Sequence, residues 1–398
     1  MVAVKDLESI LDPTARARLD RWRQARSLFL RPDTPAAERA LSDALAKRWL
    51  RAQIYGRARR VLAERIPDLL ADLSERLGPL AAQVRVSPED PHQTKWDAVG
   101  NLMPLPYAAR QVRALWLLDA LRHGRLFVEF QPIFELREGK PLGFEGLLRA
   151  ESAGGDRHLA AEIFPAAQVL GIELAFERLS WMLVLEAGQR LPSDSMLFLN
   201  VNPQLLLGDG SALSHLGEEA ERTEFPYARL ALDLVEIERI ESLDRLRGAL
   251  AIPHDLGVSI ALDDVTSGYG TLKYCSGLAP RWIKVDSGIT RNIREDPPRR
   301  AILQLLAQVA REARVGLIAE GIEDGEDLDV CLREGVLAAQ GYFLARPSSE
   351  PPEASADFRA WLAARRAAPP EERGEPVSAE REPAEPAGRP ADEPADEL

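Results

Sequence analysis

The sequence predicts an α/β protein in which a TIM-like (β/α)8 barrel follows a smaller α-helical domain and precedes a disordered tail. Three observations predict this order. Short apolar runs alternate with amphipathic stretches from about residue 109, helical periodicity dominates the residues before it, and the last thirty residues are rich in proline and acid. We therefore expect domains at 1–108, 109–366 and 367–398.

Residues 1–108 carry the spacing of amphipathic helices. In 62–77, "LAERIPDLLADLSERL", leucine and isoleucine recur every three or four residues, which predicts a helix with one buried face. The segment before it is also interpreted as a helix, and 85–96 is predicted to be a loop. That preceding segment is crowded with cations, namely Lys47, Arg48, Arg51, Arg57, Arg59 and Arg60. We favour a solvated helix face, and the alternative is a docking surface for an acidic partner or an anionic lipid.

Eight short apolar runs predict the strands of the barrel. They are apolar on both faces, as buried strands are, and amphipathic helical stretches separate them. In chain order they read RLFVEFQPIF, PLGFEGLLR, MLFLNVNP, RLALDLVE, VSIALDDV, RWIKVD, VGLIAEGIE and LAAQGYFLARP. Repeated βα units of this kind predict one closed barrel.

The last thirty residues predict a disordered segment. They hold seven prolines, ten acidic residues, three arginines and no aromatic residue. Such a composition buries too little apolar surface to offset the entropy of an ordered chain. The segment also carries −7 of the formal net charge of −13, so the rest of the chain is only mildly acidic.

The composition excludes several classes of protein. No run of 18 apolar residues predicts a transmembrane segment, and the first residues lack the pattern of a signal peptide, so we expect a cytoplasmic location. The net charge of −13 argues against general binding of nucleic acid. Two cysteines and five scattered histidines cannot build a thiolate or imidazole metal site. Any metal is therefore expected to have oxygen ligands, which suit Mg²⁺, Mn²⁺ or Ca²⁺.

Polar residues recur near the end of nearly every predicted strand. Taken singly, each has a structural explanation: Asn200 could cap a turn, Asp233 could pair with an arginine, and Lys284 could lie on the surface. Their repeated placement is the functional signal, because the carboxyl ends of barrel strands meet on one face. The set consists of Gln131, Glu145, Asn200, Asp233, Asp263, Asp264, Lys284, Glu320, Glu323 and Gln340.

So many carboxylates on one rim repel one another unless positive charge lies among them. One or two hard divalent cations fit that requirement. Acidic and amide ligands with one lysine suit the hydrolysis of a phosphodiester. In such sites the cations activate water and hold phosphate oxygens, and a lysine stabilises charge or orients the water.

These motifs resemble the EAL domain of bacterial cyclic-di-GMP signalling over residues 109–366. "GFEGLLR" at 143–149 is similar to the signature GFEALLR, and FQPI is similar to YQPI. Further along, LNVNPQLL resembles VNLSPxxL, LALDLVE resembles LxLEITE, and ALDDVTSGYGTL resembles xIDDFGTGYSSL. Finally WIKVD resembles LKID, LIAEGIE resembles VVAEGVE, and QGYFLARP resembles QGYLFSRP. The motifs occur in the order that the family has.

The resemblance implies hydrolysis of cyclic-di-GMP to linear pGpG with Mg²⁺ or Mn²⁺, inhibition by Ca²⁺, and a homodimer formed through the barrel. We also expect a protein partner for the N-terminal domain. The implied metal ligands are Glu145, Asn200, Asp233, Asp263, Asp264 and Glu320. The implied catalytic residues are Glu145, Lys284, Glu320 and Glu323. The implied substrate-binding residues are Gln131, Leu147, Arg149, Asp264, Asp286, Gln340 and Pro347, and the implied loop anchor is Glu236.

Three positions depart from the family pattern. Gly146 replaces the alanine of the signature, where we expect a cost in backbone freedom rather than chemistry. Asp233 is one methylene shorter than the family's glutamate. The loop 265–271 reads VTSGYGT in place of FGTGYSS, and a loosened loop would lower turnover more than binding. An active phosphodiesterase is the favoured function. The alternatives are a catalytically weak or inactive cyclic-di-GMP receptor that signals through the N-terminal helices, and an interaction scaffold.

Overall fold

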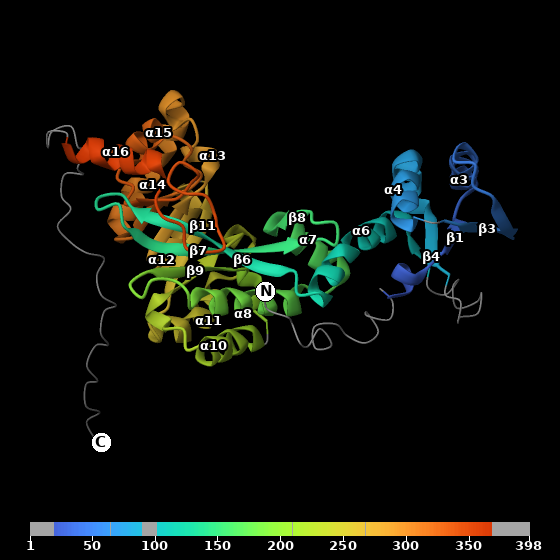
Figure 1. The fold of residues 1–398 in the computed structure, drawn as a ribbon, viewed down its shortest axis with the longest axis horizontal. Helices are drawn as coiled ribbons and strands as arrows, with labels where there is room; N and C mark the ends of the chain where they lie inside the picture. The colour runs from blue at the N-terminus through green and yellow to red at the C-terminus, as the bar shows by residue number, and fades with distance from the viewer. Residues whose placement is uncertain (1–19, 64, 90–101, 209, 267, 368–398) are drawn as a thin grey trace, which may run out of the picture. The chain divides into compact units, whose positions relative to one another are not determined.

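The computed structural model describes residues 20–63, 65–89, 102–208, 210–266 and 268–367 (Figure 1). The chain divides into two compact units, which are described separately. The first comprises Met1–Phe127 with Leu148–Glu177, and the second comprises Val128–Leu147 with Arg178–Leu398. The tail from 368 onward and most of the loop predicted at 85–96 lie outside the described residues. The predicted domain boundaries stay predictions.

A five-stranded antiparallel sheet forms the N-terminal part of the first unit, in the order β2-β3-β1-β4-β5. Its strands are β1 (Ser27–Pro32), β2 (Ala52–Tyr55), β3 (Ala58–Leu62), β4 (Val84–Pro88) and β5 (Met103–Pro104). The helices α3 (Pro35–Lys47), α4 (Ile66–Leu77) and α6 (Leu105–Arg122) share one hydrophobic core with it. The domain predicted as α-helical therefore has its helices but also contains a sheet that was not predicted.

The helix expected in 62–77 is present from Ile66 onward as α4, whereas Leu62 belongs to β3. Of the cation-rich segment before it, Lys47 ends α3, and the residues from 52 onward form a hairpin of two strands rather than a helix. These strands are only four and five residues long, and β3 carries two consecutive arginines, so no clear apolar alternation marks the hairpin. Both arginines form salt bridges with residues distant in sequence: Arg59 with Glu38 and Arg60 with Glu89. Residues 85–88, predicted as loop, belong to β4, whose Val84 and Val86 are buried in the same core.

The eight predicted barrel strands are all present and form a closed sheet. Its order is β6-β14-β13-β12-β11-β10-β9-β7, β6 also pairs with β7, and the short β8 pairs with β7. The bounds are β6 (Leu126–Glu135), β7 (Pro141–Glu151), β8 (Arg157–Leu159), β9 (Met196–Val201), β10 (Leu230–Leu234), β11 (Ser259–Val265), β12 (Trp282–Val285), β13 (Gly316–Ala319) and β14 (Ala338–Ala339).

The first strand departs from the repeated βα scheme. Neighbouring strands from β7 round to β14 are parallel, whereas β6 is antiparallel to β14. A short turn at 136–140 joins β6 to β7, where the scheme expects a helix. The amino-terminal half of β6 therefore lies at the end of the barrel where the other strands have their carboxyl ends.

Helices connect most of the other strands, and α11, α12 and α14 lie outside the barrel in Figure 1. Side-chain caps begin several of them: Ser242 caps α11, Asp296 caps α14 and Asp324 caps α15. The bounds are α7 (Ala160–Leu170), α8 (Glu173–Gly188), α9 (Pro203–Leu206), α10 (Ser211–Arg222), α11 (Leu243–Asp255), α12 (Gly268–Leu278), α13 (Ser287–Thr290), α14 (Pro297–Ala313), α15 (Gly325–Arg333) and α16 (Ala356–Ala367).

One cluster of buried apolar side chains fills the inside of the barrel. Its core layer consists of Ile133, Phe198, Ala231, Ala261, Trp282, Ile318 and Ala338, and Met196 lies one level below Phe198 on β9. Because side chains alternate between the two faces of a strand, the residues two positions away also point inward, one level higher or lower. This layer therefore determines which residues form the next level.

Candidate active site

The level above the core layer is polar on every strand of the barrel. Asp233, Asp263 and Lys284 each lie two residues after a core residue of the same strand. Gln131 lies two residues before Ile133, because β6 runs in the opposite direction. The complete level consists of Gln131, Glu145, Asn200, Asp233, Asp263, Lys284, Glu320 and Gln340. The convergence expected from the strand ends is therefore present.

Lys284 lies at the centre of this level, and its side chain is 1% exposed. Its Nζ is 2.6 Å from Asp233 Oδ2 and 2.7 Å from Glu320 Oε1. Asp263 Oδ1 is 2.9 Å from the same nitrogen, and Glu145 Oε2 is 3.4 Å from it. One buried cation thus contacts carboxylates from four other strands or strand ends.

Two amide side chains donate hydrogen bonds to the carboxylates of Glu145 and Glu320. Asn200 Nδ2 donates to Glu145 Oε1 at 2.8 Å, and Gln340 Nε2 donates to Glu145 Oε2 at the same distance. Gln340 Nε2 also lies 3.1 Å from Glu320 Oε1. Glu145 is therefore buried at 6% exposure with a partner for each oxygen.

A bulge at the end of β11 brings two consecutive aspartates to one site. Leu262 pairs with Ile283 and Val265 with Val285, so Asp263 and Asp264 together lie opposite Lys284. Asp264 has a φ of 51°, a left-handed conformation that aspartate tolerates better than most residues. In a regular strand the two side chains would point to opposite faces. Here one carboxylate oxygen from each lies within 4.8 Å of a Glu320 oxygen.

Burial and crowding move the pKa values of this cluster apart. Burial alone would lower the pKa of Lys284, but the four carboxylates together raise it well above the ordinary value, so the side chain stays protonated. Burial raises the pKa of Asp233 well above its ordinary value, and repulsion from Asp263 adds to this. Burial likewise raises the pKa of Glu320. For Glu145, Lys284 and the two amides outweigh burial and lower the pKa.

The donor set fits a hard divalent cation. Four carboxylates face a single lysine, so the cluster has an excess of negative charge. Among the described residues, the buried oxygens Asn200 Oδ1, Asp233 Oδ1 and Gln340 Oε1 accept no hydrogen bond. Buried oxygens without a donor are costly, and a cation with oxygen ligands would satisfy them.

Three further predicted residues have partners outside this network. Asp286 caps the short helix α13 through a 2.8 Å bond from Gly288 N. Glu323 is about half exposed and pairs with Arg291. Glu236 pairs with Arg239 at 2.7 Å, at a residue with a φ of 54°. The roles expected for them stay predictions.

The predicted substrate residues on β6 and after β14 lie next to each other. Phe130 forms an antiparallel bridge with Ser348, which sets Gln131 beside Pro347. Leu147 is half-buried on β7, and Arg149 is buried on the same strand, where its Nη1 donates to Leu148 O at 3.0 Å. Within the altered loop, Val265 is buried and Thr266 exposed, and Ser267 lies outside the described residues.

Gly146 has a packing role that the sequence did not indicate. A Cβ at this position would lie 2.4 Å from Val184 Cγ1 of α8, far inside the normal contact distance. The φ of Gly146 is not in the left-handed region, so its backbone conformation does not require glycine. The expected cost in backbone freedom stays a prediction. The glycine is needed because a β-branched valine occupies the space of a methyl group.

Two supporting residues also escaped the sequence analysis. Trp181 donates its indole N–H to the backbone oxygen of Asn200 at 3.3 Å. Thr290 is fully buried and donates to the backbone oxygen of Glu320. Both hold the main chain beside a site residue. Neither belongs to a recognisable motif, and no local pattern marks such long-range contacts.

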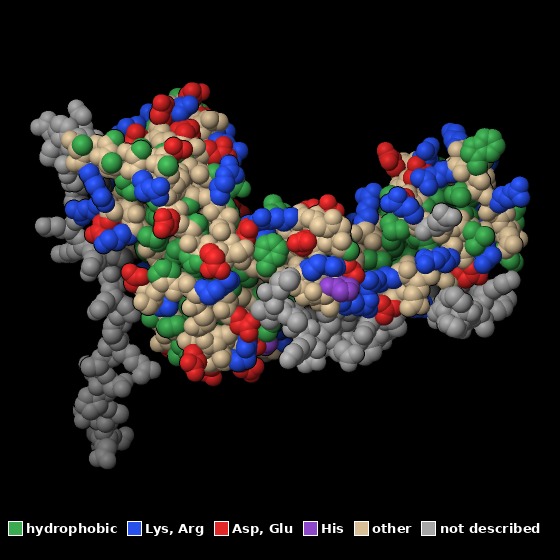
Figure 2. Space-filling model, in the orientation of Figure 1, with side chains coloured by type: hydrophobic (Ala, Val, Ile, Leu, Met, Phe, Trp, Pro, Cys, Tyr) green, Lys and Arg blue, Asp and Glu red, His purple; other side chains and the backbone are tan. Residues whose placement is uncertain are grey.

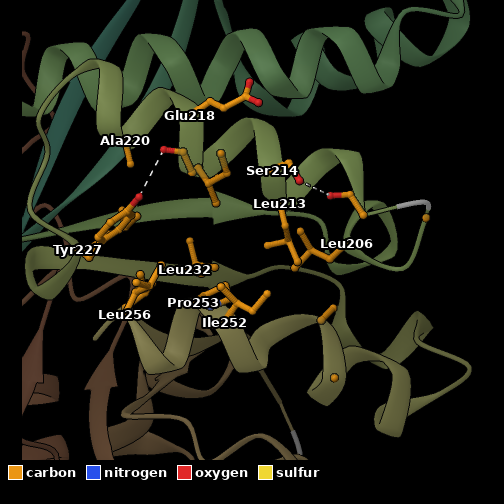
Figure 3. A pocket seen from close by; sticks show the side chains of 18 of the residues that line it. Leu206, Leu213, Ser214, Glu218, Ala220, Tyr227, Leu232, Ile252, Pro253 and Leu256 are labelled. Carbon is orange, nitrogen blue, oxygen red and sulfur yellow. Dashed lines mark hydrogen bonds between the residues drawn. The ribbon is translucent and has the colours of Figure 1, made fainter.

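A separate cavity of about 760 Å³ lies on the outside of the barrel between α10 and α11 (Figure 3). Leu206, Leu213 and Ile252 line it with other apolar residues, and Leu230 and Leu232 of β10 contribute to it. Because side chains alternate along β10, Leu232 points to the cavity and the adjacent Asp233 points to the polar cluster. The two spaces are therefore on opposite faces of the same strand.

The comparisons with known proteins agree with this architecture. A family model described as "EAL domain" matches residues 114–347. The chain is 29% identical over 241 residues to the uncharacterised protein y4lL of Sinorhizobium fredii. The matched residues are 60% of this chain and 29% of that protein. It is 26% identical over 235 residues to the probable cyclic di-GMP phosphodiesterase PdeG of Escherichia coli, covering 58% of this chain and 46% of that protein. The chain thus spans less than half the length of these relatives.

Solved structures share the fold. A standalone EAL protein from Vibrio cholerae O395 in its c-di-GMP-bound form has a TM-score of 0.50 at 24% identity, covering 59% of this chain and 97% of that one. The YkuI protein of Bacillus subtilis, in complex with c-di-GMP and calcium, has a TM-score of 0.54 at 23% identity, covering 63% of this chain and 64% of that one. At this identity the likeness shows the shared barrel.

Proposed function

This chain belongs to the EAL domain family, and we propose that it is a metal-dependent phosphodiesterase that hydrolyses cyclic-di-GMP to linear pGpG. The relatives named as cyclic di-GMP phosphodiesterases support this activity at the level of the family. The observation that carries the proposal for this chain is the buried cluster of four carboxylates around Lys284, with three buried oxygens that accept no hydrogen bond from described residues.

Glu145, Asn200, Asp233, Asp263, Asp264 and Glu320 would hold one or two Mg²⁺ or Mn²⁺ ions. When bound, such ions supply Lewis acidity and lower the pKa of a water molecule. Lys284 keeps its proton, so it can donate to the attacking oxygen or to phosphate but cannot accept a proton. The amides of Asn200 and Gln340 hold Glu145 in one orientation, which keeps its oxygens aimed at the cluster.

The remaining residues would bind the nucleotide and move protons. Gln131 and Pro347, side by side at the end of the barrel, would contact the substrate together with Leu147, Gln340 and Asp286. Arg149 would bind a phosphate oxygen, since a guanidinium suits that geometry. Burial raises the pKa of Glu320 well above its ordinary value, which favours a role in proton transfer, and Glu323 would assist it.

Product analysis tests this proposal. Purified protein is incubated with cyclic-di-GMP and Mg²⁺ or Mn²⁺, and pGpG is followed by chromatography, with nucleotide binding in Ca²⁺ measured in parallel. We expect pGpG from the natural protein, and none from Glu145→Ala or Lys284→Ala. A matched control is Lys273→Ala, because Lys273 is an exposed lysine on α12.

Each other outcome identifies a different function. Binding in Ca²⁺ with no product in Mg²⁺ or Mn²⁺ would make the chain a cyclic-di-GMP receptor, and neither binding nor product would leave an interaction scaffold. Product without added divalent ion, and in the presence of a chelator, would contradict the metal dependence. A homodimer through the barrel and a cytoplasmic location stay predictions, which sedimentation analysis and cell fractionation check.

A further inference from the structure

A tryptophan occupies the position after α3 that helices usually give to glycine. Trp49 N donates to Ala46 O and Leu50 N to Leu45 O, which is the Schellman pattern of helix termination. Trp49 has a φ of 58°, the left-handed region, and its exposed fraction is 93%. Neither backbone preference nor core packing explains a tryptophan here.

The strand that follows exposes further apolar side chains. Ile54 of β2 is 71% exposed and Tyr55 is 41% exposed. β2 is an edge strand that pairs only with β3 among the described residues. Single exposed apolar residues are ordinary on a protein surface. Ile54 and Tyr55, as consecutive strand residues, expose apolar side chains on the two faces of this edge, and Trp49 lies within seven residues of both.

Cations flank these side chains along the sequence. From Lys47 to Ala63 the sequence has six basic residues and no acidic one, in a chain with a net charge of −13. Three of the six are neutralised within the fold, as Arg48 pairs with Asp72, Arg59 with Glu38 and Arg60 with Glu89. The exposed Lys47, Arg51 and Arg57 make no ion pair within the described part of the chain. Figure 2 shows blue and green side chains side by side over the region of α3 and β3.

We propose that this β2 edge surface, formed by Lys47, Trp49, Arg51, Ile54, Tyr55 and Arg57, docks on a membrane that contains anionic phospholipid. Phosphate headgroups would neutralise the three exposed cations, and Trp49 and Ile54 would insert at the level of the glycerol backbone, where tryptophan is favoured. No described helix is long and apolar enough to cross a bilayer.

Two other partners for this surface, the chain's own acidic segment and a second copy of the chain, would match only some of its features. The chain's own acidic segment 368–398 supplies negative charge, but Val377 and Leu398 are its only large apolar residues, so it cannot cover Trp49 and Ile54. A second copy of the β2 edge would bring like charges together across a two-fold axis. An anionic bilayer satisfies the charges and the apolar side chains together.

Vesicle sedimentation with the full chain tests the docking. We expect the protein to sediment with phosphatidylcholine vesicles that contain phosphatidylglycerol, and not with phosphatidylcholine alone. Raised salt should weaken this binding. Arg51→Gln and Arg57→Gln should each weaken it about fivefold. Trp49→Gly should abolish most of it while the protein stays folded, because glycine adopts the left-handed conformation without strain.

The chain offers a matched control for the apolar contribution. Ile54 and Ile252 are each 71% exposed, and Ile252 lies on α11 of the barrel. Ile54→Ser should weaken vesicle binding, and Ile252→Ser should leave it unchanged. Equal loss in both variants, or no sedimentation with anionic vesicles, would overturn the proposal. Loss in the arginine variants without loss in Trp49→Gly and Ile54→Ser would overturn it in favour of a purely acidic partner.

Discussion

The two faces of β10 border regions of different packing: a tightly packed polar cluster on the inside of the barrel and a cavity on the outside. On the inner face, Asp233 is fully buried, and its Oδ2 lies 2.6 Å from the Lys284 ammonium. On the outer face, Leu230 and Leu232 border a cavity of about 760 Å³ between α10 and α11. One residue along the strand separates a crowded charged network from open space.

This difference shows that the effect of a substitution on stability depends on the packing around it. In the polar cluster and the strands that hold it, neighbouring strands and α8 fill the space. Adding a methyl group there causes a steric clash, and removing a charge leaves buried groups without their partner. Beside the cavity, a Cβ added at Gly248 of α11 would have nothing within 4 Å, and the same holds for Gly217 of α10. Identical substitutions should therefore have opposite effects in the two regions.

Removing the central cation breaks the inner network and has the largest expected effect. Lys284→Met keeps the length of the side chain but removes the one buried cation that four carboxylates share. We expect a loss of about 3–5 kcal/mol in the free energy of unfolding, measured by urea denaturation. Added Ca²⁺ should recover part of the loss, because a divalent ion can replace the charge. Lys273→Met, at an exposed lysine, is the control, and a Lys284→Met protein as stable as that control would refute the balance of charge described here.

Restoring the alanine of the family signature tests the packing at the inner wall. Gly146→Ala places a methyl group 2.4 Å from Val184 Cγ1, so we expect a loss of about 1–3 kcal/mol in the free energy of unfolding. The double variant with Val184→Ala should recover most of that loss, since it vacates the space. Purely additive effects in this double-mutant cycle would show that the two residues do not compete for space.

The partly accessible edge of the cluster should respond to pH. Burial raises the pKa of Asp264 to about 6, and repulsion from Asp263 and Asp286 adds to this, so the carboxyl is protonated and neutral below that pH. A carboxyl must lose its proton to bind a cation. The Mn²⁺ affinity, measured by calorimetric titration, should therefore rise with pH by up to about tenfold per unit below pH 6, and less steeply above it. Asp264→Asn should flatten this rise, and an equally steep rise in that variant would assign it to other groups.

The smallest expected effect is a gain at the cavity. Gly248 lies in the interior of α11 with free space around it, so Gly248→Ala should raise the free energy of unfolding by about 0.5–1 kcal/mol. Thermal or urea denaturation measures the gain. Gly146→Ala serves as the comparison, being the same substitution at a filled position. A loss of stability in Gly248→Ala would mean that the cavity is closed in solution.

Much of the barrel could be predicted from the sequence, because its signals are local. The eight apolar runs are strands, and the polar residues at their ends form one level inside the barrel. The oxygen-rich donor set was also predictable from composition alone, since cysteine and histidine are scarce. The N-terminal sheet was not predictable in this way, because its hairpin at 52–62 is short and arginine-rich.

By itself, the sequence determined which residues alternate along each strand, and hence which side chains could meet inside a barrel. Tertiary structure alone decided the antiparallel direction of β6, the bulge that turns Asp263 and Asp264 toward Glu320, and the pairing of each cluster carboxylate with Lys284. It also decided that Gly146 makes room for Val184. The physical reason is that these features depend on contacts between residues far apart in the chain, and such contacts leave no periodic signal in either segment.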